Sequence, residues 1–533
     1  MPAICNPSAR HLLPALLIGV LAYAGFFAVG VKPSFDGINS DAAIYIVMAD
    51  RLSPWRSQTF DFAQQVFALY PFPPLYPMTL AVVGADSTTP TLIYTIDAAL
   101  LAIAAAASWL WARRAGGALP VALATVAVNL TPIALFTAMG VFSEPLYLAL
   151  TMAALALLAS NAPSSRHWLA AATLLGLAAV TRSVGIFALP PLLFIWWRRA
   201  AVREPWVPLA ALLPTLIWSA VKWRYGWHGG YTDGLFTAGL WPGLMALLHQ
   251  IPTNLQALAY HLLRCFDILG NRYSAVACTL LAALAGLALA VRTRRVALDA
   301  LYVAAYMTVI LLWPFPNHYP RFLWVILPFF AAYACWGAGL LVELLGQARL
   351  ASAASLATAA VILCITLPST LLVTLQIVRA DSAQQRIYTR VGEWYGYDRA
   401  SDANRVMSYA ARVRHILEQI GAQLPAGSCV TSTAPERVML HAGRFSQRPP
   451  ASNRPLPALR ASLAACPYVL MLRARAWPAI NEPLYYPQNR VATELETLRI
   501  DLLDPAQAHS PPLVILARYV GTQRATGVPA NPP

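Results

Sequence analysis

The stretch LLPALLIGVLAYAGFFAVGV, residues 12–31, decides the class of this chain. It carries no charged residue and has the length that an α-helix needs to cross the hydrocarbon core of a bilayer. A secretory signal peptide has a shorter apolar region and ends in a small-residue cleavage site, so this run predicts a permanent membrane anchor. Arg10 and His11 precede the run and predict that the N-terminus is cytoplasmic.

Composition extends this conclusion to most of the 533 residues, because 58% are apolar and only 11% are charged. Soluble domains carry about 25% charged residues, so an ordinary soluble enzyme is excluded, and so is a disordered chain. Ten further apolar runs give, with the first, about eleven predicted transmembrane helices. These runs cover residues 90–111, 118–137, 145–160, 168–181, 184–197, 206–224, 275–291, 298–313, 322–342 and 351–375.

The charge pattern supports this topology. The formal net charge is +15, and Lys32 and Lys222 are the only lysines. Arginines mark alternate connections, as the positive-inside rule requires of cytoplasmic loops. They are Arg113, Arg114, Arg166, Arg198, Arg199, Arg203, Arg292, Arg294, Arg295 and Arg349. The basic charge therefore indicates topology and no nucleic-acid partner. The arginine- and alanine-rich composition favours a bacterial inner membrane, with an archaeal or actinobacterial membrane as the alternative.

The predicted fold class is a multi-pass α-helical membrane protein with a small C-terminal α/β domain. Residues 1–375 form the transmembrane domain, with outer-surface loops at 32–89 and 225–274. Within the first loop, residues 41–52 and 73–83 have a helical pattern and are too short to span, so we expect helices on the membrane surface.

Residues 376–533 form the predicted periplasmic domain. We expect a helix at 403–421 and strands at 429–433, 468–472 and 513–519, broken by a proline-rich loop at 447–457. Cys429 and Cys466 both lie beside predicted strands, and the sequence leaves two alternatives open, a disulfide in an oxidising compartment or two buried thiols.

Two carboxylates are candidates for chemistry. Asp41 lies in FDGINSDAAIYIVMADRL, four residues before Tyr45 and on the same helical face. Glu144 lies in TAMGVFSEPLYLAL, at the start of a span. A helix cap for Asp41 and a favourable acid at a helix N-terminus for Glu144 are the alternative interpretations. The topology places both on the outer surface, where they can serve as general base and as metal or acceptor ligands.

Two arginines fall at the same surface. Arg182 lies in AAVTRSVGIFALPPLL, and Arg321 follows His318 and Tyr319 in PFPNHYPRFLWVILP. Each alone is typical of an interfacial anchor, whereas two of them near two acids favour an anionic lipid headgroup. Asp97, inside the 90–111 run, is expected to pair with one of these arginines or with Tyr94.

Several motifs are absent. The sequence has no P-loop, GxGxxG, Asp-x-Asp or HExxH pattern, so we expect no nucleotide cofactor and no soluble nucleotide donor. The seven cysteines are scattered and form no metal-binding framework.

The order of these motifs resembles the type C glycosyltransferases, in the branch with the protein O-mannosyltransferases and the lipid A aminoarabinose transferases. The resemblance covers about residues 10–345. It rests on Asp41 and Tyr45, the surface helix YPFPPLYPMTL (70–80), SEPL (143–146), the T-R-x-x-G of Thr181, Arg182 and Gly185, and YPRFLWVILP (319–328).

The resemblance implies transfer of a sugar from a polyprenyl-phosphate carrier to a lipid, glycan or protein acceptor outside the membrane, with inversion. It assigns the general base to Asp41, a helper or divalent-cation ligand to Glu144, and phosphate binding to Arg182 and Arg321. Tyr45, His318 and Tyr319 are the other candidate substrate-binding residues.

The sequence departs from this pattern at three points. Family members often have a second acid directly after the first-loop aspartate, where Ala42 stands here. Glu144 replaces the aspartate of the aminoarabinose transferases, and both changes bear on the metal. Phe72 and Pro73 occupy the region where some relatives use a lysine for phosphate.

Three alternatives stay open. A transporter or flippase of lipid-linked glycans would place charges at mid-bilayer, and a non-catalytic scaffold would tolerate Asp41→Asn. A glycan polymerase or ligase would use arginine and histidine in a large loop, for which His228, His249, His261 and Arg264 are candidates.

Overall fold

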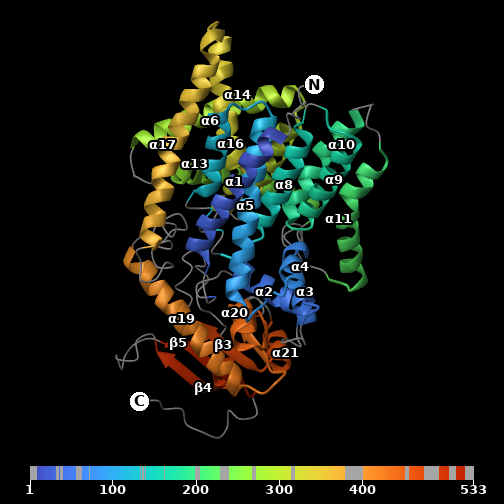
Figure 1. Cartoon of the computed structure of the whole chain (residues 1–533). Helices are drawn as coiled ribbons and strands as arrows, with labels where there is room; N and C mark the ends of the chain where they lie inside the picture. The colour runs from blue at the N-terminus through green and yellow to red at the C-terminus, as the bar shows by residue number, and fades with distance from the viewer. Residues whose placement is uncertain are drawn as a thin grey trace.

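The computed structural model describes residues 9–31, 35, 40–55, 63–70, 72–131, 134, 137, 140–160, 162–198, 204–227, 239–266, 272–313, 319–378, 400–449, 455–472, 491–502 and 512–521. A bundle of long helices forms one end of the molecule, and a small α/β domain forms the other (Figure 1). This arrangement confirms the predicted fold class.

Six described helices are long and apolar enough to cross a membrane. They are α1 (Ala9–Gly30), α5 (Pro90–Arg114), α11 (Trp206–Arg224), α14 (Arg272–Arg294), α16 (Tyr319–Leu344) and α17 (Ala351–Val378). The other helices of the bundle are α6 (Leu119–Ala127) with η1 (Val128–Leu130), α8 (Glu144–Leu158), α9 (Ser165–Ala179), η2 (Ser183–Ala188) with α10 (Leu189–Arg198), α15 (Leu298–Leu311) and η5 (Ala348–Leu350). Helices occupy the described parts of each predicted apolar run, of which 118–137 is described only in part, and the count of eleven spans stays a prediction.

Small residues let these helices approach closely, as is common where apolar helices pack in lipid. A Cβ at Gly176 of α9 would lie 2.6 Å from the carbonyl oxygen of Ala211 in α11, and one at Gly337 of α16 would overlap the backbone of Leu284 in α14. These two glycines therefore set how closely their helix pairs approach. Any larger residue at either position would push the two helices apart.

Helix α13 (Leu240–Phe266) is the main departure from the expected loop at 225–274. Its polar residues keep it outside the apolar runs from which spans are predicted. One of them has a structural role: Asn254 donates from Nδ2 to the carbonyl oxygens of Leu311 and Trp313, both at 2.8 Å. These bonds satisfy carbonyl groups where α15 ends, as a helix C-terminus requires.

In the described part of the first loop, three short helices lie between the bundle and the C-terminal domain: α2 (Ser40–Leu52), α3 (Ala63–Leu69) and α4 (Leu75–Val82) (Figure 1). They confirm the helices expected at 41–52 and 73–83. Residues 42–49 of α2 are all buried, in an apolar cluster that also contains Met439 and Leu440 of the C-terminal domain. The domain therefore packs directly against the helix that carries Asp41.

Among its described residues, the C-terminal domain contains a five-stranded mixed sheet with strand order β2-β1-β3-β5-β4. Strands β2, β1 and β3 are parallel, and β5 is antiparallel to β3 and β4. The strands are β1 (Cys429–Ser432), β2 (Phe445–Gln447), β3 (Tyr468–Leu472), β4 (Leu495–Leu502) and β5 (Pro512–Tyr519). The helices are α19 (Ala400–Gln423), α20 (Pro435–Arg437), the π-helical η7 (Val438–Ala442), α21 (Leu456–Ala465) and η8 (Ala492–Glu494).

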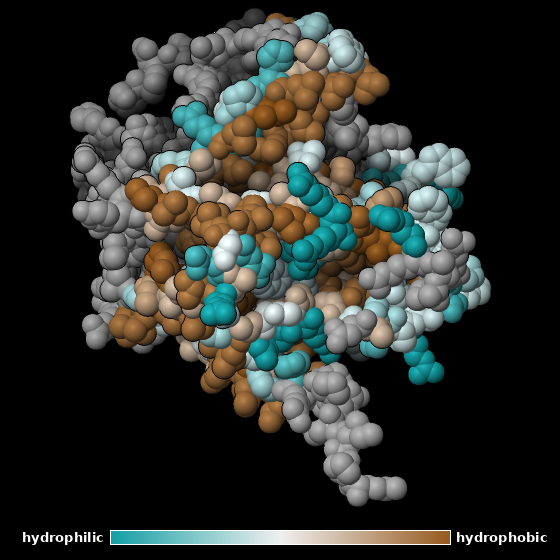
Figure 2. All heavy atoms as spheres, turned by 90° about the horizontal axis from the view of Figure 1, so that it is seen from above, coloured by the Kyte–Doolittle hydropathy of each residue, from teal (hydrophilic) through white to brown (hydrophobic). Residues whose placement is uncertain are grey.

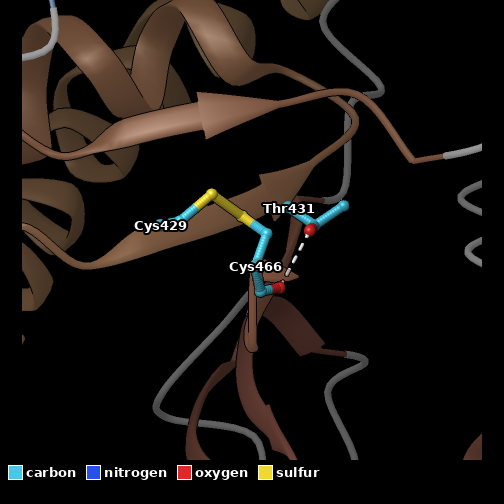
Figure 3. Close-up of a disulfide and its surroundings, with 3 residues drawn as sticks. All are labelled: Cys429, Thr431 and Cys466. Carbon is cyan, nitrogen blue, oxygen red and sulfur yellow. Dashed lines mark hydrogen bonds between the residues drawn. A yellow bond between two sulfur atoms is a disulfide. The ribbon is translucent and has the colours of Figure 1, made fainter. Parts of the chain in front are cut away.

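The predicted helix at 403–421 and all three predicted strands are present. No sequence pattern predicted β2, which has only three residues, or β4, an edge strand whose side chains are half-exposed or exposed. Cys429 and Cys466 form a disulfide that joins β1 to the residues just before β3, and Thr431 Oγ1 donates to the carbonyl of Cys466 at 3.2 Å (Figure 3). The disulfide alternative is therefore confirmed.

Candidate functional site

Four charged side chains from distant parts of the chain meet at the end of the bundle that faces α2. Asp41 lies in the first turn of α2, Glu144 is the first residue of α8, Arg182 lies between α9 and η2, and Arg321 lies in the first turn of α16. The expectation that the two acids and two arginines converge on one surface is therefore met.

Arg321 connects the two carboxylates. Its Nε donates to Glu144 Oε1 at 2.6 Å, and its Nη1 donates to Asp41 Oδ2 at 3.0 Å. Charge-assisted bonds of this length are among the strong hydrogen bonds of proteins. One planar guanidinium thus fixes the position of Asp41 relative to Glu144.

Arg182 binds the same glutamate from a second direction. Its Nη1 lies 2.6 Å from Glu144 Oε1 and 3.3 Å from Ser143 Oγ. Aromatic rings support both guanidinium groups, with Arg321 4.1 Å from the ring centre of Phe142 and Arg182 5.2 Å from that of Phe322. Such cation–π contacts strengthen where water is excluded.

The four side chains differ in exposure. The Glu144 side chain is fully buried, those of Arg321 and Arg182 are 7% and 12% exposed, and that of Asp41 is 25% exposed. Glu144 Oε2 is buried and accepts no hydrogen bond from any described residue. Glu144 is therefore placed to hold the arginines, whereas Asp41 is the carboxylate that a second molecule can reach.

Tyr45 is connected to this cluster through Ser143. Its hydroxyl shares a hydrogen bond of 3.2 Å with Ser143, and its ring packs at 5.6 Å from Phe72 and 5.2 Å from Tyr76. Burial, and then the charge of Asp41, raises the pKa of Tyr45 above its usual range, so the hydroxyl stays protonated. We interpret Tyr45 as a positioning residue for Ser143, and its substrate contact stays a prediction.

Asp97 has a different partner from those expected. Its Oδ1 accepts a hydrogen bond of 2.8 Å from the hydroxyl of Tyr76, so the pairing is with α4 and with neither arginine nor Tyr94. The sequence could not identify Tyr76 as the partner, because its separation from Asp97 along the chain matches neither helix nor strand periodicity. The bond ties surface helix α4 to α5.

Some residues of the site were not predicted from the sequence, and two of the predicted residues have no described side chain. Ser143 joins Tyr45 to Arg182, and only its place beside Glu144 in SEPL marks it in the sequence. Phe142 and Phe322 likewise read as ordinary apolar residues. His318 lies outside the described residues, and Tyr319 begins α16 but its side chain is not among those described.

A divalent cation between Asp41 and Glu144 would need free carboxylate oxygens that face one another. The guanidinium of Arg321 occupies the position between these carboxylates and uses an oxygen of each. No group of three or more histidine, cysteine or acidic side chains suited to a metal occurs among the described residues. These residues therefore do not fit a resident divalent ion.

Comparisons with known proteins were made on sequence and on structure. No family model matches the sequence, and no curated protein matches it significantly. In structure, the chain is similar to ArnT from Cupriavidus metallidurans in the apo state, with a TM-score of 0.49 and 12% identity over 96% of this chain and 98% of ArnT.

The same ArnT bound to undecaprenyl phosphate gives a TM-score of 0.45 at 12% identity, covering 95% of this chain and 97% of that one. The oligosaccharyltransferase AglB from Archaeoglobus fulgidus, in complex with an inhibitory peptide and a dolichol-phosphate, gives 0.45 at 13% identity, covering 86% and 69%.

Proposed function

We propose that this protein is a membrane glycosyltransferase that moves a sugar from a polyprenyl-phosphate carrier to a lipid, glycan or protein acceptor. The observation that carries the proposal is the bridge of Arg321 between buried Glu144 and accessible Asp41, with Arg182 beside it. It combines a carboxylate that can accept a proton with two guanidinium groups that can bind a phosphate.

The arginines suit the donor phosphate. Guanidinium groups bind phosphate oxygens through paired hydrogen bonds, and they stay charged at any physiological pH. Arg182 and Arg321 are held in place by Glu144 and by the rings of Phe322 and Phe142. Little reorganisation is then needed when negative charge develops, which is the condition for strong electrostatic stabilisation.

Asp41 acts as the general base. It accepts the proton of the acceptor hydroxyl as that oxygen attacks the anomeric carbon, the bond from this carbon to the phosphate oxygen breaks, and the bonding electrons pass to the phosphate. In-line attack inverts the anomeric centre. General-base assistance contributes about 10²–10⁴-fold to such a step, and the arginines stabilise the departing phosphate.

The proposal includes a fixed cation in place of a metal. Arg321 already supplies positive charge between Asp41 and Glu144, where the resemblance implied a divalent ion. We therefore expect transfer to continue in excess EDTA. Loss of transfer in EDTA that Mn²⁺ or Mg²⁺ restores would refute this part of the proposal and leave the transferase itself standing.

The alternatives differ in what they require of the charges. A transporter or flippase needs charged residues along a path at mid-bilayer, whereas these four gather where their helices begin. A polymerase would use the histidines near α13, and among these His249 is exposed and hydrogen-bonds the carbonyl of Met245 in its own helix. Neither arrangement is favoured by a specific contact among the described residues.

The proposed location is a bacterial inner membrane, with the N-terminus in the cytoplasm and the C-terminal domain in the periplasm. The disulfide of that domain supports an oxidising compartment. The site then faces the outer leaflet, where a polyprenyl phosphate can enter laterally between helices.

The test is a mass-spectrometric comparison of surface glycans, glycolipids and glycoproteins in a deletion strain. The strain is complemented at matched expression with wild type, Asp41→Asn or Glu343→Gln, the last an exposed acid away from the site. We expect one sugar mass to be lost and to return with wild type and Glu343→Gln only. Full restoration by Asp41→Asn would refute the role of the base and favour a transporter or scaffold.

A further inference from the structure

A cavity of about 320 Å³ lies at the opposite end of the bundle from the proposed catalytic site. Helix α8 relates the two places, because Glu144 is its first residue while Leu155 and Leu158 near its other end line the cavity. Helix α8 has fifteen residues and is about 22 Å long, so the two places lie near its opposite ends. The proposed transfer reaction uses none of the residues of this cavity.

The cavity lies where the basic connections of the bundle meet. Its lining includes Ala115 after α5, Leu158 at the end of α8, and Arg292 and Arg295 around the end of α14. Figure 2 looks onto this end of the molecule and shows hydrophilic side chains standing among hydrophobic ones. The topology places this end at the cytoplasmic leaflet.

The charged side chains among the described lining residues leave one cation in excess. Arg292 is neutralised by Asp299, with Nε and Nη2 both donating to Oδ2 at 3.1 and 2.6 Å, and its guanidinium lies 4.6 Å from the ring centre of Trp336. Arg295 is exposed and pairs with no acid among the described residues. The cavity therefore complements a ligand with a single negative charge.

Apolar side chains share the lining with these charges, which favours an amphipathic ligand. Trp111, Trp168, Leu155, Ile195 and Leu298 line the cavity. Beside Ile195 on α10, Phe194 and Trp197 are 43% and 64% exposed and extend the apolar surface along the helix. Basic pockets between helices on the cytoplasmic side suit anionic lipid headgroups.

From the cavity, its excess arginine and its apolar walls, we propose a binding site for an anionic phospholipid at the cytoplasmic leaflet. The headgroup phosphate lies against Arg295, with Arg292 held close by Asp299. An acyl chain follows the exposed side chains of α10. This inference goes beyond the proposed transferase activity and does not depend on it.

The test is native mass spectrometry of the full chain purified in detergent, titrated with phosphatidylglycerol or with phosphatidylcholine of the same acyl chains. We expect wild type to retain one phosphatidylglycerol per chain, about five-fold more strongly than phosphatidylcholine, which is the contribution of one basic residue near a lipid surface. Arg295→Gln should remove this preference. The neighbouring Arg294→Gln, also exposed and outside the cavity lining, should keep it.

Two further measurements, a cavity-filling variant and competition by soluble anions, identify the ligand. Ala159→Phe fills the cavity without changing its charge and should abolish the bound lipid. If it does not fold, the two arginine variants still decide. Equal loss of preference in Arg294→Gln and Arg295→Gln would indicate general surface attraction and overturn the site. Displacement of the lipid by glycerol 3-phosphate or inorganic phosphate would overturn it in favour of a soluble anion.

Discussion

Glu144→Gln removes the charge that holds both site arginines while keeping the size of the side chain. In wild type, Glu144 Oε1 accepts from Arg321 and lies against Arg182, both at 2.6 Å, and the carboxylate is fully buried. A hydrogen bond to a charged partner contributes about 1.5–3 kcal/mol and a neutral one about 0.5–1.5 kcal/mol. The two contacts together should therefore lose about 2–3 kcal/mol.

A second effect adds to this loss. Without the glutamate charge, two buried guanidinium groups remain with Asp41 alone, and an uncompensated buried charge brings the cost of a broken pair to about 3–5 kcal/mol. We expect the unfolding temperature to fall by about 5 °C in detergent. Transfer should fall by about 10²–10³-fold, as when an electrostatic stabiliser of the transition state is lost.

The assay is thermal unfolding of the purified chain followed by tryptophan fluorescence, together with transfer measured at a temperature where all variants are folded. Glu343→Gln, an exposed acid on the same helix as Arg321, is the matched control and should behave as wild type. A double variant with Arg182→Gln should lose less than the sum of the single losses, because the two residues share one interaction. A Glu144→Gln protein that unfolds at the wild-type temperature and transfers normally would refute the reasoning.

Three further predictions concern other parts of the fold. Replacing Cys429 and Cys466 by serine opens a link across a sequence separation of 37 residues, which should destabilise the C-terminal domain by about 4 kcal/mol; unchanged protease resistance of the domain would contradict this. The hydrogen bond from Arg460 lowers the pKa of Glu494, so this pair should stabilise the domain above the usual glutamate pKa of about 4.3 and lose its effect as the pH falls through the lowered value. Unfolding midpoints of wild type and Glu494→Gln should therefore converge in acid, and a constant difference would count against the pair. Tyr76→Phe leaves the buried Asp97 carboxylate without its donor and should cost about 1–3 kcal/mol, relieved by a second change, Asp97→Asn, in the same denaturation assay; the absence of any relief would show that the bond is unimportant.

The packing of the C-terminal domain connects its stability to the proposed catalytic site. Met439 and Leu440 belong to the same apolar cluster as the buried face of α2, whose first turn carries Asp41. A change that loosens this domain therefore reaches the position of the proposed base through packed side chains. We expect the cysteine variants to lower transfer as well as stability for this reason.

The sequence by itself determined the class of the protein and the order of its helices. Apolar runs of sufficient length and arginines in alternate connections report membrane insertion directly, because both effects act on local segments. The helix at 403–421 and the strands that begin at Cys429 and Tyr468 were equally local signals. Helix α13 and edge strand β4 were not predicted, because their polar residues interrupt the patterns that mark a span or a strand.

Only the tertiary structure decided how the site is connected. Sequence patterns predicted that Asp41, Glu144, Arg182 and Arg321 lie at one surface, and they suggested a metal between the two acids. They did not show that Arg321 bridges Asp41 and Glu144. They likewise placed Asp97 with one of these arginines or with Tyr94, whereas Tyr76 is its partner. Pairings between residues far apart in the chain depend on how helices approach and rotate, and that geometry is set by packing across the whole bundle.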